Sequence, residues 1–447
     1  MTMRLRFRPD RLDRQILKLA LPATLALAAD PLLSLVDTAL VGRLGSVPLA
    51  ALGIDTAVFT TVFFAFNFLA YGTTAAVARR RGAGDATGAS TYAVQALWLA
   101  MGLGVLVTVV LLAAGPAIVK AMGATAAVRP VALSYLRIRA LGAVPMLIAQ
   151  VGHGTFRGLH DTRTPLLITV AANVVNGVVS WVLIYRAGMG VAGAAIGTVL
   201  AEAGAAVALL VLGGRALGVR SEHPLRLAIQ RHAMTEILRV SRNLFLRTAS
   251  LLAGLLVTTA VATRMGTVVV AAHQIARELW AMLALVLDGF AIAGQAMIAT
   301  ALGSGDVRRA VAESRRLVLW GLAGGVAIGL LYLPLGGVLP GVFTGDQAVL
   351  GLVSGVWVIV AALQPIGGVV FVLDGILMGA GDFRFLFAST AAAALGALVP
   401  VSLLALSQGW GLQGVWAGMA ALMLVRLVAS LQRLRSGRWT TAGRLDA

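Results

Sequence analysis

Cysteine is absent from the 447 residues of this chain. Its absence excludes disulfide bonds, thiolate metal sites and cysteine nucleophiles. Aromatic residues are also sparse, with five Tyr and eight Trp, which is too few for a surface that stacks on nucleic-acid bases. We therefore expect no nucleic-acid partner, even though the formal net charge is +18.

Charged residues make up only 12% of the chain, with 18 Asp and Glu against 36 Lys and Arg. Apolar residues reach 59%, and the mean hydropathy is +0.91. Soluble domains contain about 45–50% apolar and about 25% charged residues. The composition therefore predicts a protein that is embedded in a lipid bilayer.

Long apolar stretches follow one another along the whole chain. A transmembrane helix needs about 20 mostly apolar residues. The stretches that meet this requirement are 14–42, 49–75, 90–115, 130–153, 164–185, 191–213, 240–264, 270–300, 316–337, 351–376, 386–406 and 412–432. They predict an all-α fold, a polytopic membrane protein with twelve transmembrane helices in two six-helix lobes.

Arginine indicates which side of the membrane each loop faces. With the N-terminus placed inside, most Lys and Arg fall in inner loops, including residues 79–81 and the C-terminal Arg433, Arg435 and Arg438. Cytoplasmic loops are enriched in these residues. We expect a multi-pass protein of the cell membrane, inner or plasma, with both termini in the cytoplasm. The basic start precedes a long apolar stretch without a small-residue cleavage site, which predicts a retained first span.

The sequence matches itself at an offset of 221 residues. GAGD at Gly82–Asp85 faces GSGD at Gly303–Asp306, and other short segments match at the same offset. This register predicts a duplication, with an N-lobe at 1–213, a cytoplasmic linker at 214–236 and a C-lobe at 237–447. Six spans separate equivalent points, so both halves have the same orientation. Transporters built from parallel repeats bind substrate between their halves.

Two aspartates lie inside the first span, where each acid needs a reason because its insertion costs about 2.5–3.5 kcal/mol. Asp30 and Asp37 are seven residues apart and project from the same helix face. Pro31 removes a backbone donor and predicts a bend. A carboxylate in a low-dielectric environment binds a proton more readily than an exposed one. Asp37 and Asp30 are therefore candidate proton-coupling residues.

The fifth and sixth spans carry polar side chains along one face of each helix. Asn173, Asn176 and Ser180 follow one another at i, i+3 and i+7. Thr198 precedes Glu202 by four residues. Such groups either join helices by hydrogen bonds, typically for about 0.6 kcal/mol, or line a substrate site. The pattern leaves both interpretations open.

The second half has intramembrane charges of its own. Asp288 and Asp374 lie in the eighth and tenth spans, and their counterparts in the repeat are Asn67 and His153. Arg247, in the seventh span, is a candidate counter-ion for one of these acids. We favour structural pairing and keep all three in the candidate polar network. None of the five histidines lies in a pattern such as H-E-x-x-H, so we expect no metal and no cofactor.

Segments of both halves resemble one family of transporters. Those in the first half are LPATLALAADPLLSLVDTALVGRLGSVPLAALG (21–53), FRGLHDTRTPL (156–166) and NVVNGVVSWVLIYRAGMGVAGAAIGTVLA (173–201). They resemble the multidrug and toxic compound extrusion (MATE) family. LDGFAIAGQAMIATALGSGD (287–306) and LDGILMGAGDFRF (373–385) are similar to its DinF-like branch. The resemblance covers nearly the whole chain and implies two lobes and export driven by H⁺ or Na⁺.

The resemblance also implies roles for particular residues. In this family the aspartate of the VDT segment, here Asp37, is the coupling residue. Asn176 and Thr198 match polar groups that surround it in proton-coupled members. A third position, usually Asp, is Ser180 here. Asp30 or Glu202 would then take its place.

The sodium-coupled branch of the family carries acids in its seventh and tenth helices. The aligned positions, around Thr258 and at Gly367, have no acid here. The resemblance therefore favours H⁺ as the coupling ion over Na⁺.

Other classes of function fit the sequence less well. Lys18 and Lys120 do not follow a G-x-x-x-x-G-K-[ST] loop, which disfavours an ATP-driven pump. No G-x-S-x-G segment is present, and we expect no enzyme. The prediction is a secondary active multidrug exporter that exchanges protons for small cationic or amphipathic molecules by alternating access. The alternatives are a lipid-linked precursor flippase and sodium-coupled antiport. The expected partners are small-molecule substrates and the bilayer, and the expected state is a monomer.

Overall fold

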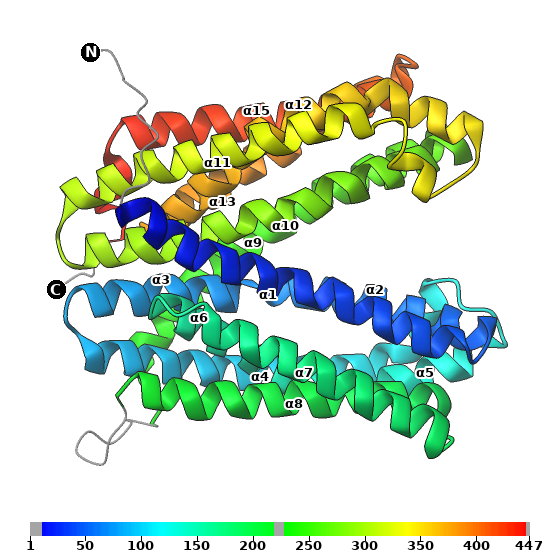
Figure 1. Ribbon diagram of the computed structural model, residues 1–447, viewed down its shortest axis with the longest axis horizontal. Helices are drawn as coiled ribbons and strands as arrows, with labels where there is room; N and C mark the ends of the chain where they lie inside the picture. Colours follow the sequence, from blue (N-terminus) through cyan, green and yellow to red (C-terminus); the bar gives the residue numbers. More distant parts are fainter. Residues whose placement is uncertain (1–10, 219–227, 444–447) are drawn as a thin grey trace. The chain divides into compact units, whose positions relative to one another are not determined.

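A computed structural model describes residues 11–218 and 228–443 (Figure 1). Within these ranges every regular element is helical, so the predicted all-α fold is confirmed. The first half contains α1 (Arg11–Gly42), α2 (Ser46–Phe66), α3 (Phe68–Gly82), α4 (Ala86–Ala121), α5 (Val128–Ala140), α6 (Ala143–Gly158), α7 (Arg163–Trp181), the π-helix η1 (Val182–Arg186) and α8 (Gly190–Ala216).

The second half repeats the six spans, but its second and fourth spans are single helices where the first half has two. It contains α9 (Arg231–Met265), α10 (Thr267–Gly303), α11 (Val307–Leu335), the short η2 (Pro340–Val342), α12 (Gln347–Gly379), α13 (Phe383–Ala393), the π-helix η3 (Ala394–Leu398), α14 (Val399–Ser407), α15 (Gly411–Arg435) and η4 (Arg438–Thr441). Only the fifth span of each half contains a π-helical turn among the described residues.

The membrane spans agree with the predicted ones. Eleven helices of the described chain are long and apolar enough to cross a membrane. The pair α5 and α6, which is bent by 48° at its break, raises this number to twelve when it is counted as one span. Each of the twelve predicted stretches overlaps one of these spans. The chain is a multi-pass membrane protein.

Backbone geometry repeats at the same 221-residue offset as the sequence. Gly45 and Gly266 precede α2 and α10 with φ angles of 121° and 128°. Asp85 caps α4 by accepting a hydrogen bond from a backbone N–H three residues on, at 2.7 Å. Asp306 caps α11 in the same way, at 2.8 Å. Caps and turns that recur in this register show that the two halves are structurally equivalent.

Contacts divide the chain into two compact units whose boundaries lie inside helices. One unit is residues 25–245, here the N-unit, and the other is 1–24 with 246–447, here the C-unit. The boundaries within α1 and α9 are 221 residues apart. The predicted lobes, 1–213 and 237–447, were divided at the linker between two spans, so their limits differ from these. Of the predicted linker, 219–227 lies outside the described residues, and Arg231 already belongs to α9.

Polar contacts within each unit explain where the boundaries fall. In the C-unit, the guanidinium of Arg316 on α11 donates to both carboxylate oxygens of Asp13, at 2.6 and 2.5 Å. In the N-unit, Gln95 of α4 holds the segment before α9, because it bonds to the Ala228 carbonyl at 2.9 Å and to the Gln230 N–H at 3.0 Å. Positions 95 and 316 are repeat equivalents. Each therefore fixes the start of a long helix that continues into the other unit.

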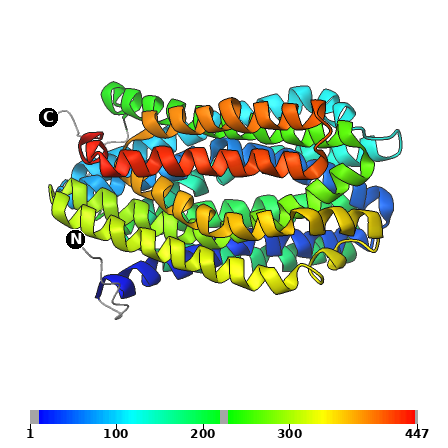
Figure 2. The same ribbon diagram turned by 90° about the horizontal axis from the view of Figure 1, so that it is seen from above.

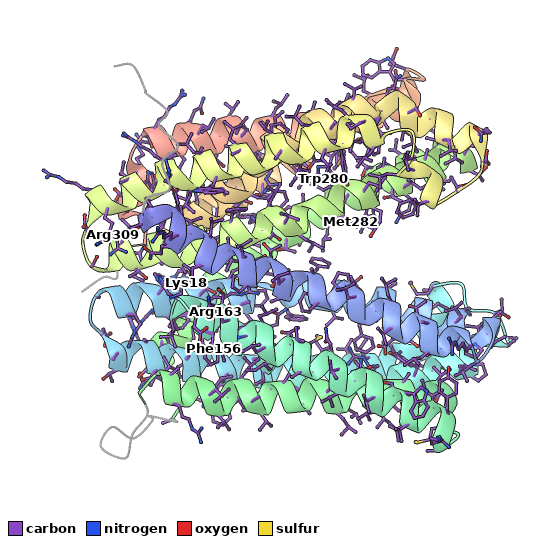
Figure 3. The ribbon with its side chains drawn as sticks, viewed as in Figure 1. Lys18, Phe156, Arg163, Trp280, Met282 and Arg309 are labelled. Carbon is purple, nitrogen blue, oxygen red and sulfur yellow. The ribbon has the colours of Figure 1, made fainter. Side chains whose placement is uncertain are left out.

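The core of each unit depends on close helix packing. In the N-unit, α6 packs against α3, α4 and α8, with Phe156 buried (Figure 3). In the C-unit, α12 packs against α10, α11 and α15, and Figure 2 shows α15 in red beside the orange α13–α14 segment. A Cβ at Gly368 would lie 2.1 Å from the Gly321 carbonyl oxygen, so only glycine permits this approach of α11 and α12.

Candidate functional site

The predicted coupling residue Asp37 is buried near the end of α1. Its side chain faces α7, where the amide of Asn176 donates to the two carboxylate oxygens at 3.5 and 3.4 Å. The Ser180 hydroxyl in turn donates to the Asn176 carbonyl oxygen at 2.8 Å. Asn176 and Ser180 are fully buried. The structure thus joins three predicted site residues into one hydrogen-bonded chain.

Further contacts bind α1 to the fifth span on both sides of Asp37. Asn173 donates from its amide to the Ala29 carbonyl at 2.9 Å. The Tyr185 hydroxyl donates to the Leu40 carbonyl at 2.7 Å. Asn173 therefore serves as a helix–helix contact in this conformation, whereas Asn176 reaches the acid itself.

Thr198 and Glu202 of α8 face the same region but make different contacts. The Thr198 side chain lies beside the Asp37 carboxyl. Its hydroxyl donates to the Ala194 carbonyl of its own helix at 3.0 Å. Glu202 forms a bidentate ion pair with Arg139 of α5, with N–O distances of 2.7 and 2.9 Å.

Space for the polar groups comes from two glycines. Gly142 lies at the break between α5 and α6, and a Cβ there would be 2.6 Å from Arg139 Nη1 and 2.8 Å from Glu202 Oε2. A Cβ at Gly197 of α8 would lie 2.2 Å from Ser180 Oγ. Larger residues at these positions would displace the ion pair or the hydrogen-bonded chain.

Asp55 of α2 is an acidic residue that we did not select from the sequence. It is fully buried, and neither carboxylate oxygen has a hydrogen-bond partner among the residues that the structure describes. Arg139 is close enough to interact with it electrostatically. The signal was present, because any acid inside a span is a candidate for function. Arg139 gave a similar signal, as an arginine within the fourth span.

Charges in the C-unit form a separate cluster. The guanidinium groups of Arg247 on α9 and Arg426 on α15 both donate to Asp374 Oδ2. Asp288 lies within electrostatic reach of Arg426. Arg247 thus has the role of counter-ion that we expected for it, and Arg426 is a partner that sequence reasoning missed. Asp30, the second predicted coupling residue, lies within α1, but its side chain is outside the described part of the structure.

Comparison with known proteins matches the chain to one protein family. The MatE family model matches residues 22–182 and again 244–404, once in each half. Protein DETOXIFICATION 44, chloroplastic, of Arabidopsis thaliana is 34% identical over 96% of this chain and 84% of its own length. DNA damage-inducible protein F of Escherichia coli is 29% identical over 96% and 94%. A probable multidrug resistance protein NorM of Agrobacterium fabrum is 26% identical over 89% of each chain.

Solved structures share the fold over nearly the whole chain. A MATE crystal structure in the bent conformation has a TM-score of 0.86 at 24% identity and covers 96% of this chain and 95% of that one. A MOP superfamily transporter from Pyrococcus furiosus, described with a binding pocket of reverse polarity, has a TM-score of 0.84 at 23% identity over 97% of both chains. With both halves matched by the family model, this chain belongs to the MATE family of efflux transporters.

Proposed function

We propose that this MATE transporter is a proton-coupled antiporter that exports small cationic or amphipathic organic molecules by alternating access. The observation that carries the proposal is the buried Asp37 carboxylate, hydrogen-bonded to Asn176 and backed by Ser180. A buried acid with weak, neutral partners can gain and lose a proton without breaking an ion pair. That property suits a coupling residue.

The geometry around Asp37 favours H⁺ over Na⁺. A sodium ion is a hard cation and takes oxygen ligands, as calcium and magnesium do. The Asn176 side chain turns its NH₂ group toward Asp37, while its carbonyl oxygen accepts from Ser180. The Thr198 hydroxyl proton goes to Ala194. Of these two neighbours, Thr198 alone has a side-chain oxygen free to ligate a cation beside Asp37, whereas a single carboxylate is sufficient for a proton.

The charges around Asp37 favour cationic cargo. Asp37, Asp55 and Glu202 are acids, and Arg139 is the base that interacts with them. An excess of acids in a low-dielectric region attracts positive ligands and repels negative ones. We infer that substrate and proton compete for this region.

Protonation would act through the contacts between α1 and α7. A neutral Asp37 attracts the Asn176 amide less strongly than a carboxylate does, because hydrogen bonds to charged groups are the stronger ones. The bond from Asn173 to Ala29 on one side and from Tyr185 to Leu40 on the other would remain. The stretch of α1 between them would then repack and expel the bound molecule.

Location and assembly are part of the proposal. We place the protein in the cell membrane with both termini in the cytoplasm and infer a monomer. Arginines at the end of α3 and at the start of α11, where Figure 3 labels Arg309, support this orientation. The two equivalent halves within one chain support function as a monomer.

The test is ethidium efflux from bacterial cells that lack their own pumps, with wild type compared with Asp37→Asn at equal expression. We expect export by wild type, loss with a protonophore, no change when Na⁺ is replaced by choline, and loss in Asp37→Asn. Asp346→Asn is the matched control, because this exposed residue caps α12 and asparagine caps a helix equally well. Normal export by Asp37→Asn would refute the proposed coupling, and no export by wild type would favour a lipid-linked precursor flippase.

A further inference from the structure

Asp55 is placed where an ionised carboxylate is expensive. It lies on the buried face of α2 with Ala51 and Phe59, one turn away on either side. These neighbours belong to a hydrophobic cluster that includes Val107 and Leu111 of α4. Both oxygens of Asp55 lack hydrogen-bond partners within the described part of the chain. Burying an isolated charge in such surroundings is strongly unfavourable, so the group either neutralises itself or finds a counter-ion.

Arg139 is the counter-ion within reach. Its guanidinium lies 4.5 Å from the centroid of the Phe59 ring, on the face of α2 that carries Asp55. The same guanidinium already forms two hydrogen bonds with Glu202. One arginine thus serves two acids. The trio is electrically neutral only when one of the two carboxyl groups holds a proton.

The fold does not require these charges. The repeat equivalents of Asp55, Arg139 and Glu202 in the C-unit are Ala276, Val360 and Met423. These three are fully buried and belong to one hydrophobic cluster. A buried ion pair is often replaced by apolar residues with no loss of stability. Charges that the equivalent half does without point to a role beyond stability.

We propose that Asp55, Arg139 and Glu202 form a second proton-binding site beside Asp37. When Arg139 pairs with Glu202, as here, the proton is on an Asp55 oxygen. When Arg139 turns to Asp55, the proton is on Glu202. The other ionisable groups that interact with this cluster are Tyr135 on α5 and Asp37 on α1. Tyr135 is neutral at physiological pH, and Asp37 is held by Asn176.

This second site rests on the proposed antiport, because its consequence is a change in the number of protons exchanged for each cation. Exchange of one proton for one monovalent cation moves no net charge across the membrane. When the bound cation displaces the proton of this site as well as that of Asp37, two protons are exchanged per cation and the exchange is electrogenic. A potential of 100 mV acting on one charge then adds about fiftyfold to the attainable substrate gradient.

Infrared difference spectroscopy on the purified protein at pH 7 tests the site without transport. A protonated carboxyl group has a carbonyl-stretch band that shifts in ²H₂O. We expect one such band to disappear in Asp55→Asn. It should also disappear in Glu202→Gln, although Asp55 is still present, because Arg139 is then free to pair with Asp55. Arg139→Gln should give the bands of two protonated acids.

The matched control is Glu236→Gln. Glu236 forms an ion pair with Arg80 in the same unit, at 2.8 Å, with one acid to one base. Its spectrum should keep the band. An unchanged band in Asp55→Asn would overturn the proposal, and so would a band that persists in Glu202→Gln.

A transport measurement separates this inference from the proposed function. In proteoliposomes with ethidium, wild type should respond both to a pH gradient and to a potassium diffusion potential. The triple variant D55A/R139V/E202M carries the residues that the C-unit uses at these positions and is expected to fold. Whatever pH-driven exchange this variant retains should no longer respond to the potential. Wild-type exchange driven by pH but insensitive to potential would overturn the second site and leave antiport intact, whereas no pH-driven exchange would reject antiport itself.

Discussion

The two units share one fold but differ in what fills equivalent positions. The N-unit has Asp37, Asp55, Arg139 and Glu202 where the C-unit has Thr258, Ala276, Val360 and Met423. Those four C-unit residues are fully buried. The comparison teaches that the helical scaffold alone needs no charge there. The ionisable groups of the N-unit are therefore best explained by what the protein does.

The C-unit has buried charges as well, but they are arranged differently. Asp374 is shared by Arg247 and Arg426, and all three lie on helices of one unit. In the C-unit one acid interacts with two arginines. In the N-unit one arginine, Arg139, interacts with two acids, Asp55 and Glu202. An acid shared by two arginines suits a structural role. Two acids with one cation must bind a proton, and this suits coupling.

Exchange of residues between equivalent positions gives the largest expected effect. Asp37→Thr, which places the C-unit residue in the N-unit, should reduce ethidium efflux to the level of empty vector. Thr258→Val should retain at least about half of it, because the Thr258 hydroxyl makes only a local bond to Leu255, at 2.7 Å, and a net hydrogen bond is worth about 1 kcal/mol. Equal efflux by both variants would show that the asymmetry has no functional meaning.

Removal of the shared acid in the C-unit should affect stability. Asp374→Ala leaves Arg247 and Arg426 buried without their carboxylate, which we expect to lower the free energy of unfolding by about 3–5 kcal/mol. Thermal unfolding in detergent, followed by tryptophan fluorescence, measures this. Asp346→Asn at the other end of α12 is the control. Efflux per folded molecule should persist, and its complete loss at normal stability would give this cluster a direct part in transport.

A pair of glycines in α8 tests the hydrogen-bonded chain without altering a polar group. A methyl group at Gly197 would collide with Ser180 Oγ, whereas a methyl group at Gly204 would have no neighbouring atom within 4 Å. Gly197→Ala should cost about 1–3 kcal/mol in stability and reduce efflux severalfold. Gly204→Ala should be neutral or stabilising in both measurements. Wild-type efflux by Gly197→Ala would mean that the position of Ser180 is unimportant.

Much of the fold was predictable because hydropathy and the repeat are long-range signals. Each span is a run of about 20 mostly apolar residues. The 221-residue offset then shows which spans of the two halves correspond. The unit boundaries were not predictable. They depend on which half the start of α1 and of α9 packs against, as with Asp13 and Arg316, and contacts across 303 residues leave no pattern in the sequence.

The site was predictable in part. Asp37, Asn176 and Ser180 could be grouped through the family resemblance, and the helical spacing of the last two placed them on one face. The pairing of Arg139 with Glu202 depends on how two helices are rotated about their axes, 63 residues apart in sequence. Asp55 could be recognised in the sequence as an acid within a span. What distinguishes it from the other acids is its burial without hydrogen-bond partners among the described residues, which only the structure shows.

The smallest expected effect concerns a turn that the two units build from different residues. His160 has a φ of 61°, and its repeat equivalent Gly381 has a φ of 76°. Left-handed backbone costs an L-residue about 1–2 kcal/mol, so Gly381→Ala should lower the free energy of unfolding by about that amount. Gly351→Ala, in α12 of the same unit with open space around it, should not. Thermal unfolding in detergent compares the two. If Gly381→Ala unfolds at the wild-type temperature, the C-unit turn accommodates a side chain as readily as the N-unit turn does at His160, and the difference between the units there is one of sequence alone.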